Sequence, residues 1–319
     1  MNKISNSKTV TSRADDQRQL LVSLEELSSL DPAPIWVDTR RGADYRRGHL
    51  PGAIHFDNFI HANEHTSRAE LDALAASWMA MFAAAGIPLD APVIFYDAGM
   101  ENRAPRPAFM LRALGNSESR VLHGGIRAWR EAGRPLSTTL NSRPPGFPRA
   151  RPPRLDQRWV AGVDDVIDTL RDGSAQLLDV RDEPEYRGRR RLQWNPRLGR
   201  LPGAIPLEWT ALLERDSSTA QGPLIGFKPD HELSQLVLGA GLSADLPVIV
   251  YCQKSHRACN TYLALERLGF HDIRVYVGSF REWSRRPELP IEREPREPLG
   301  HAVTPTSAQS KPHSANPQP

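Results

Sequence analysis

The chain has 319 residues, 39% of them hydrophobic and 25% charged, and its seven Trp, nine Phe and six Tyr can build apolar cores. This composition excludes a fully disordered chain, and the length corresponds to about two domains. A net charge of +3 indicates no nucleic-acid or membrane partner.

Three observations concern the compartment. The polar N-terminus lacks the apolar core of a signal peptide. No apolar stretch approaches the roughly 20 residues that a membrane-spanning helix needs. The chain has two cysteines, Cys252 and Cys259, too few for a disulfide framework. We therefore expect a soluble, cytoplasmic protein.

The composition changes along the chain and divides it into five segments. Residues 1–18 are polar and are predicted to be disordered, whereas residues 19–140 form the first predicted domain. Residues 141–155 contain five Pro and are typical of an extended linker. Residues 156–290 form the second predicted domain, and residues 291–319 are a Pro-rich C-terminal tail.

The two predicted domains repeat one another. Matching landmarks appear in the same order in both, at the pairs Asp38 and Asp179, Pro51 and Pro202, Asp97 and Cys252, and Trp129 and Trp283. The offsets are 141, 151, 155 and 154 residues, so a few insertions explain the drift. Such a long period indicates a tandem duplication of a whole domain rather than a solenoid.

Each copy alternates predicted strands with predicted helices. Short apolar runs predict buried strands at 35–37, 93–96, 177–180 and 248–251. Helical patterns cover 71–85, 107–114, 234–240 and 258–268. The sequence therefore predicts an α/β protein in which each domain is a mainly parallel sheet with helices on both faces. Ligands of such sheets bind at the carboxyl ends of the strands.

A cysteine stands at one of these strand ends. Cys252 follows the strand predicted at 248–251, and Gln253-Lys254-Ser255-His256-Arg257 leads into the next helix. Converging loop amides, the helix N-terminus and three basic side chains all lower the pKa of a thiol and favour an anion over its sulfur. These residues are therefore predicted to be a nucleophile and its substrate-binding loop. The alternative is a buried cysteine that only ends a strand.

The first domain has an aspartate at the position of that cysteine. With Asp97 there, this domain has no nucleophile and is expected to shape the cleft from the other side. Asp38 and Asp179 are predicted to be structural, held by backbone groups or by Arg40 and Arg181. Cys259 is interpreted as a small buried residue, with a resolving thiol as the alternative. No histidine pair has metal-ligand spacing, so we predict neither metal nor cofactor.

Taken together, these residues resemble the two-domain rhodanese-type sulfurtransferases, which include thiosulfate and 3-mercaptopyruvate sulfurtransferases. The resemblance rests on the Asp-x-Arg strand ends, the two Leu-Pro-Gly-Ala-Ile segments and the Cys252 loop, and it covers roughly residues 19–290. It implies that Cys252 takes sulfur from a donor, holds it as a persulfide and passes it to cyanide or a thiol. The acceptor could be a thioredoxin-like protein, and no cofactor is needed.

Two positions depart from the family pattern. Ser255 stands where many family loops have Gly, so the turn must accommodate a side chain. Glu185 stands where thiosulfate enzymes have a donor-binding Arg, so either Arg187 or Arg181 replaces that Arg or the donor differs. The basic loop after Cys252 nevertheless resembles that of thiosulfate enzymes.

Thiosulfate is therefore the predicted donor. The alternatives are 3-mercaptopyruvate and a persulfide-carrying or regulatory module with little turnover. A Cys-based phosphatase or arsenate reductase is disfavoured because Cys252 to Arg257 spans Cys-x4-Arg, one residue shorter than the loop those enzymes use.

Overall fold

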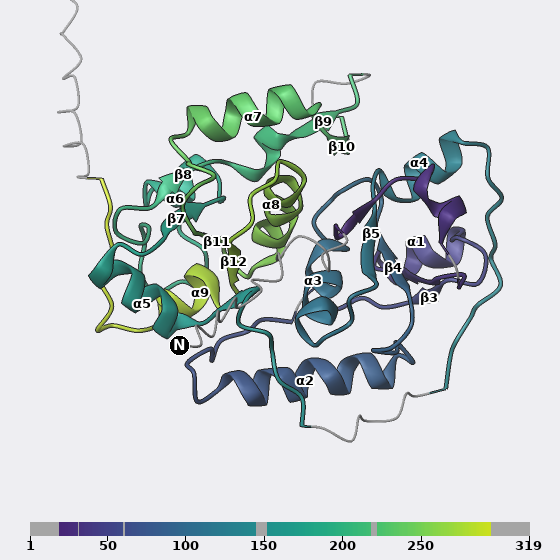
Figure 1. Ribbon diagram of the computed structural model, residues 1–319, viewed down its shortest axis with the longest axis horizontal. Helices are drawn as coiled ribbons and strands as arrows, with labels where there is room; N and C mark the ends of the chain where they lie inside the picture. The colour runs from purple at the N-terminus through teal and green to yellow at the C-terminus, as the bar shows by residue number, and fades with distance from the viewer. Residues whose placement is uncertain (1–18, 31, 60, 145–151, 218–221, 295–319) are drawn as a thin grey trace, which may run out of the picture.

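The structure is a computed structural model that describes residues 19–30, 32–59, 61–144, 152–217 and 222–294 (Figure 1). The predictions for residues 1–18 and for most of the C-terminal tail lie outside these ranges, as does the middle of the predicted linker. In the described part of the chain, no helix has both the length and the apolar character needed to cross a membrane.

The first domain is built around a five-stranded, wholly parallel sheet with the strand order β1-β5-β4-β2-β3. Its elements are β1 (Leu21–Val22), η1 (Glu26–Ser29), β2 (Ile35–Asp38), α1 (Gly42–Arg47), β3 (Ile54–His55), α2 (Leu71–Ala84), β4 (Val93–Tyr96), α3 (Pro105–Ala113), β5 (Ser119–Leu122) and α4 (Gly125–Glu131).

The second domain has a parallel sheet of the same design, with the order β6-β12-β11-β7-β8, and an added antiparallel hairpin of β9 and β10. Its elements are β6 (Val160–Ala161), α5 (Val163–Asp172), β7 (Gln176–Asp179), α6 (Glu183–Tyr186), β8 (Ile205–Pro206), η2 (Trp209–Leu212), β9 (Leu213–Arg215), β10 (Leu224–Phe227), α7 (Asp230–Gly239), β11 (Val248–Tyr251), α8 (His256–Arg267), β12 (Ile273–Tyr276) and α9 (Ser279–Trp283).

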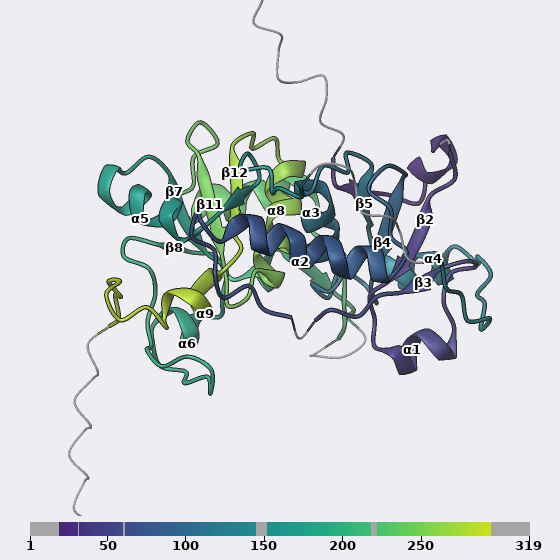
Figure 2. The same cartoon turned by 90° about the horizontal axis from the view of Figure 1, so that it is seen from below.

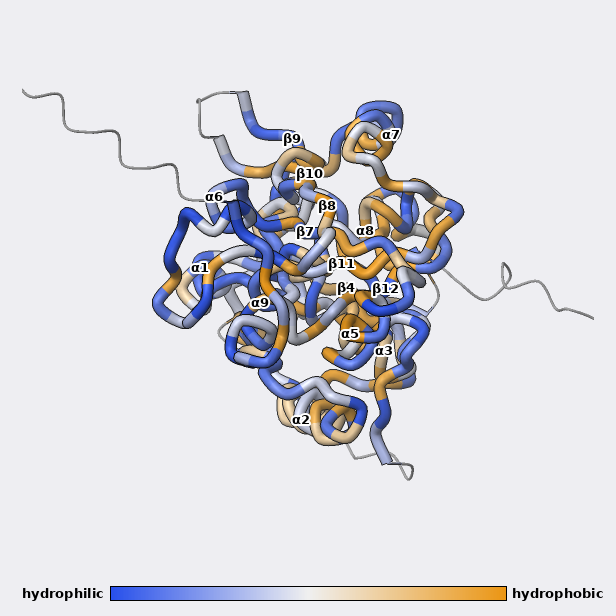
Figure 3. Tube along the Cα trace, turned by 90° about the vertical axis from the view of Figure 1, so that its left-hand side faces the viewer, coloured by the Kyte–Doolittle hydropathy of each residue, from blue (hydrophilic) through white to orange (hydrophobic). Residues whose placement is uncertain are grey.

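The duplication and the fold class are confirmed, because β4 and β11 hold the same central place in their sheets. All four residues of each strand are buried, which explains why both runs are apolar throughout rather than alternating. In Figure 3, apolar residues concentrate along the strands and α8, whereas the chain around α6 is hydrophilic.

The two domains pack against each other through α3 and α8, which lie between the sheets (Figure 1). The Phe109 and Tyr262 rings meet edge to face with their centroids 5.1 Å apart, and one apolar core cluster contains residues of both domains. Helix α2 runs along one side of both domains (Figure 2). The loop between Cys252 and the start of α8, described below, therefore lies next to the interface between the two domains.

Other contacts lie within the individual domains. The end of the described chain forms a bridge between Arg200 and Glu292, so the first residues of the tail pack on the second domain. Asp38 and Asp179 each accept hydrogen bonds from the arginine two residues later, as the sequence predicts for structural aspartates. Trp283 is fully buried in the core of its domain.

Candidate active site

Cys252 lies at the carboxyl end of β11 and is 1% exposed. The start of α9 holds it in place. The Cys252 amide donates to Ser279 Oγ at 3.3 Å, and its carbonyl accepts from the Phe280 amide at 3.0 Å. Since Ser255 N also donates to Ser279 Oγ at 3.1 Å, one hydroxyl fixes both ends of the turn. The thiol is thus carried by a rigid loop.

The loop turns back on itself at Ser255, whose φ of 63° lies in the left-handed region. Most side chains are disfavoured there, which explains why the resemblance leads one to expect Gly. This turn lets α8 begin at His256 with its first amides directed into the loop. Within the described residues, the amides of Gln253, Lys254, His256 and Arg257 have no hydrogen-bond acceptor. The loop can therefore surround an anion with amide donors.

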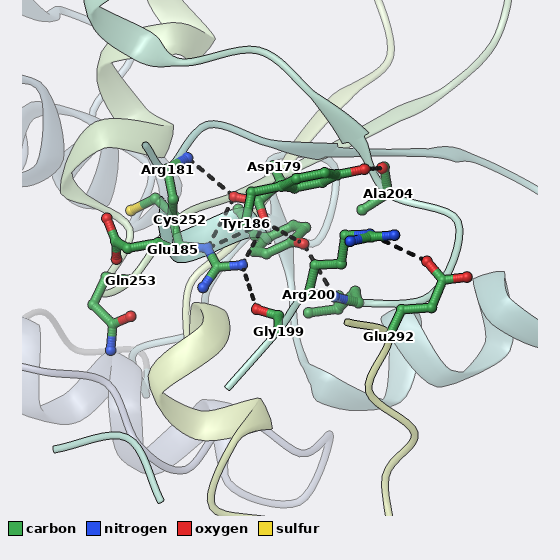
Figure 4. A network of polar contacts seen from close by, with 12 residues as sticks. Asp179, Arg181, Glu185, Tyr186, Gly199, Arg200, Ala204, Cys252, Gln253 and Glu292 are labelled. Carbon is green, nitrogen blue, oxygen red and sulfur yellow. Dashed lines mark hydrogen bonds and ion pairs between the residues drawn. The ribbon is translucent and has the colours of Figure 1, made fainter. Parts of the chain in front are cut away.

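A segment that has no counterpart in the first domain holds Gln253 in place. The Gln253 and Asn195 side chains exchange two hydrogen bonds, of 2.6 and 3.0 Å. Both side chains are buried, at 5% exposure each. Figure 4 shows the Gln253 side chain beside Cys252. The stretch between Arg187 and Gly199 is thus docked on the loop through Asn195.

Lys254 is the loop cation without a paired carboxylate. Its Nζ lies 5.8 Å from the ring centroids of both Phe59 and Trp194, and it makes no ion pair with any described residue. Burial lowers the pKa of Lys254, and the charge of Arg106 lowers it further. Lys254 is therefore available to attract an anionic substrate.

Arg257, in contrast, is neutralised by Glu185. Two hydrogen bonds of 2.6 and 3.1 Å join the guanidinium to the carboxylate, which is almost fully buried. Burial alone would raise the pKa of Glu185, but the hydrogen bonds and charge of Arg257 outweigh it and lower that pKa. The residue that departs from the family pattern thus pairs with an arginine of the loop itself.

The other two arginines predicted for the site also have carboxylate partners. Arg181 is buried, bonds both carboxylate oxygens of Asp179 and lies over the Phe280 ring at 4.0 Å. Arg187, which follows α6, pairs with Glu183 and Glu294. The structure therefore places both arginines in ion pairs and neither one in the loop.

His256 is buried at the domain interface. Its Nε2 lies 3.1 Å from the Phe59 carbonyl oxygen and 3.0 Å from Arg106 Nη1. Burial, followed by the charge of Arg106, lowers the pKa of His256 well below its usual value. The sequence-based expectation that His256 adds positive charge to the loop is wrong, because the ring is neutral at neutral pH.

Comparisons with known proteins agree with this geometry. The sequence profile of the rhodanese-like domain matches residues 22–132 and 162–286. The chain belongs to the rhodanese-like family. It is 32% identical over 277 residues to the 3-mercaptopyruvate sulfurtransferase of Escherichia coli strain K12, covering 82% of this chain and 89% of that protein.

Two more matches support the same assignment. The thiosulfate sulfurtransferase of Azotobacter vinelandii is 29% identical over 261 residues, covering 82% of this chain and 92% of that one. The crystal structure of an Escherichia coli 3-mercaptopyruvate enzyme superposes with a TM-score of 0.63 at 26% identity, covering 82% and 99%. The protein is a two-domain rhodanese sulfurtransferase, as the resemblance predicted.

The first rhodanese-like domain shows what the loop amides of this fold can do. In it, the Asp97 carboxylate accepts from the amides of Gly99, Met100, Arg103 and Ala104 at 2.7–3.2 Å. The amides that would surround a ligand are thus occupied by the domain's own carboxylate. This arrangement explains how an aspartate can replace the cysteine without disrupting the loop.

The sequence did not predict several residues that contact the Cys252 loop. They come from the first domain, the docked segment and the start of α9, and they are Phe59, Arg106, Trp194, Asn195 and Ser279. For Arg106, the internal duplication provides a signal in the sequence. It places Arg106 at the start of the helix after Asp97, as His256 and Arg257 stand after Cys252.

Proposed function

We propose that this sulfurtransferase moves sulfane sulfur from thiosulfate to cyanide or a thiol through a persulfide on Cys252. The observation that carries the proposal is the set of loop amides that find no acceptor among the described residues, beside the Lys254 cation, which pairs with no described carboxylate. In the companion domain the equivalent amides gather around a carboxylate, which supports an anion in the same place here.

The reaction has two steps. The Cys252 thiolate attacks the outer sulfur of thiosulfate, so that a new S–S bond forms while the S–S bond of the donor breaks and sulfite leaves with its electron pair. Cyanide or a thiolate then attacks the outer sulfur of the persulfide. Thiocyanate or a new persulfide departs, and the Cys252 thiolate is restored. The loop amides stabilise the anionic persulfide between the steps.

The site residues take different parts in this proposal. Lys254 and the loop amides attract the donor, whereas Gln253, Ser255, His256 and Arg257 hold the loop in shape. Arg181 and Arg187 are paired with carboxylates and take no direct part in donor binding in this proposal.

A second donor is favoured by one contact. Because Glu185 neutralises Arg257, the loop has less charge for a dianion than its sequence suggests. The donor 3-mercaptopyruvate carries a single carboxylate, and a relative with that activity matches most of the chain.

Steady-state kinetics with cyanide as acceptor decide between the donors. We expect kcat/KM to be higher for thiosulfate than for 3-mercaptopyruvate, and Cys252→Ser to be inactive with both. A higher value for 3-mercaptopyruvate reverses the donor assignment. Turnover by the serine variant contradicts the mechanism.

The acceptor in the cell is proposed to be a thiol, either small or on a thioredoxin-like protein. Both cysteines are free thiols. This state fits a reducing compartment, and we propose the cytoplasm as the site of action.

A further inference from the structure

The first domain inserts one buried charge into the interface with the cysteine loop. Arg106, the second residue of α3, is 0% exposed and forms no ion pair with any described residue. Its Nη1 donates to the His61 carbonyl at 2.6 Å, and its guanidinium lies 5.1 Å from the Trp78 ring centroid. The other two nitrogens, Nε and Nη2, have no hydrogen-bond partner in the described structure.

An unpaired buried guanidinium is costly, because the charge loses its hydration without gaining a counter-ion. The other deeply buried arginines avoid this cost. Arg40 and Arg181 each form several hydrogen bonds to an aspartate two residues earlier. Arg106 thus differs from them, because two of its buried donors have no partner among the described residues.

Arg106 lies against the loop that holds Cys252: its Nη1 is 3.0 Å from Nε2 of His256, four residues after Cys252. His256 is neutral, Lys254 is itself a cation, and the pKa of His61 is lowered by burial and by Arg106. The acidic groups that act on Arg106 are the thiols of Cys259 and Cys252.

Of the two thiols, Cys259 is the weaker candidate. Burial strongly raises its pKa, so this thiol stays protonated at neutral pH. Burial also lowers the pKa of Arg106 to about 10, which leaves the guanidinium charged under the same conditions. The group that becomes anionic during the reaction is therefore the sulfur on Cys252.

We propose that Arg106 is the counter-charge for the ionised sulfur of Cys252, supplied by the domain that has no cysteine. The inference rests on the proposed persulfide chemistry and adds a residue to it. Arg106 acts across the interface, through its electrostatic field, on the thiolate and on the persulfide that replaces it. The second domain alone would lack this charge.

The test compares Arg106→Met and Arg106→Lys with Arg120→Met. Arg120 is a buried arginine of the same domain that pairs with Glu118. The rate of Cys252 alkylation by iodoacetamide is followed against pH by peptide mass spectrometry. We expect the pH midpoint of Cys252 alkylation to move upward in Arg106→Met and to move less in Arg106→Lys. It should not move in Arg120→Met. The value of kcat/KM should fall about ten- to a hundredfold in Arg106→Met.

If Arg106→Met does not fold, the melting temperature Tm of wild type and of Arg106→Lys provides a second test. Loading wild-type Cys252 with sulfur from thiosulfate should raise Tm, because the new anion pairs with the buried guanidinium, and Arg106→Lys should show a smaller rise. An unchanged alkylation midpoint in folded Arg106→Met, or an equal Tm rise in Arg106→Lys, overturns the inference. A midpoint shift that disappears in a Cys259→Ser background also overturns it.

The two proposals fail in distinguishable ways. If wild-type Cys252 takes up no sulfur, the persulfide chemistry fails, whereas the alkylation profiles still decide the role of Arg106. If sulfur loads normally in Arg106→Met and the alkylation midpoint stays where it is in wild type, only the role of Arg106 fails.

Discussion

The chain's two cysteines lie seven residues apart but in very different surroundings. Cys252 follows β11 in a loop that has four amides without an acceptor among the described residues, whereas Cys259 lies within α8 and is fully buried. Burial raises the pKa of Cys259, which removes the thiolate needed for nucleophilic attack. This difference favours the interpretation of Cys259 as a small buried residue over a resolving thiol.

A pH prediction follows from the neutral His256. Burial and the charge of Arg106 lower its folded pKa, whereas in the unfolded chain the pKa returns to about 6.5. Below that pH the unfolded state binds more protons than the folded state. The contribution of the neutral His256 ring to the unfolding free energy is therefore complete above about pH 6.5. As the pH falls below that value, the unfolding free energy decreases by at most about 1.4 kcal/mol per pH unit.

Urea unfolding between pH 7.5 and 5.0 measures this effect. His256→Gln should show a shallower loss of unfolding free energy than wild type, because it cannot be protonated. The exposed His231→Gln variant is the control and should follow the wild-type curve. Parallel curves for His256→Gln and wild type would show that the buried ring does not stay neutral.

Among the elements, the strands were the most predictable and the helix starts the least. The bounds of β4 and β11 equal the predicted ones, because four consecutive apolar residues define a buried strand. Helices α7 and α8 begin four and two residues before their predicted starts. Their first turns are polar, and such turns carry no hydrophobic period.

The docked segment before Gly199 could not be predicted at all. Its contact with the site depends on Asn195 meeting Gln253, 58 residues further along the chain. The same is true of Arg106 and His256, which are 150 residues apart. Local patterns contain no information about such pairs, so the sequence could indicate the loop but not its neighbours.

The Asn195–Gln253 pair is expected to stabilise the loop. Asn195→Ala removes two buried hydrogen bonds and leaves the Gln253 amide without partners, which should cost about 1–3 kcal/mol of unfolding free energy. A double-mutant cycle with Gln253→Ala should give a coupling energy of about 0.5–3 kcal/mol. Additive effects of the two substitutions would mean that the segment is not docked in solution.

At the scale of the whole molecule, the interface contains buried polar contacts as well as the shared core. Glu282 of α9 accepts from the Thr66 amide at 2.9 Å and from its hydroxyl at 2.5 Å. That hydroxyl also accepts from the Val163 amide at 3.1 Å. Thr66 and Glu282 are both buried, so these bonds are not exchanged with water.

Thr66→Val keeps the shape of this side chain and removes both hydroxyl contacts. We expect it to lower the unfolding free energy by about 1–3 kcal/mol. Thr66→Ser is the matched control, because it retains the hydroxyl and should be closer to wild type. A loss in Thr66→Val that is no larger than the loss in Thr66→Ser would contradict the role of the interface hydrogen bonds, because the valine variant lacks only the hydroxyl and keeps the methyl group.

The most direct test of the central claim is the intact mass of the protein after incubation with thiosulfate, measured for wild type, Cys252→Ser and Cys259→Ser. Wild type and Cys259→Ser should each gain the mass of one sulfur atom and lose it again on adding cyanide, while Cys252→Ser gains nothing. Sulfur uptake by Cys252→Ser, or its loss in a folded Cys259→Ser, would contradict the assignment of Cys252 as the sulfur carrier.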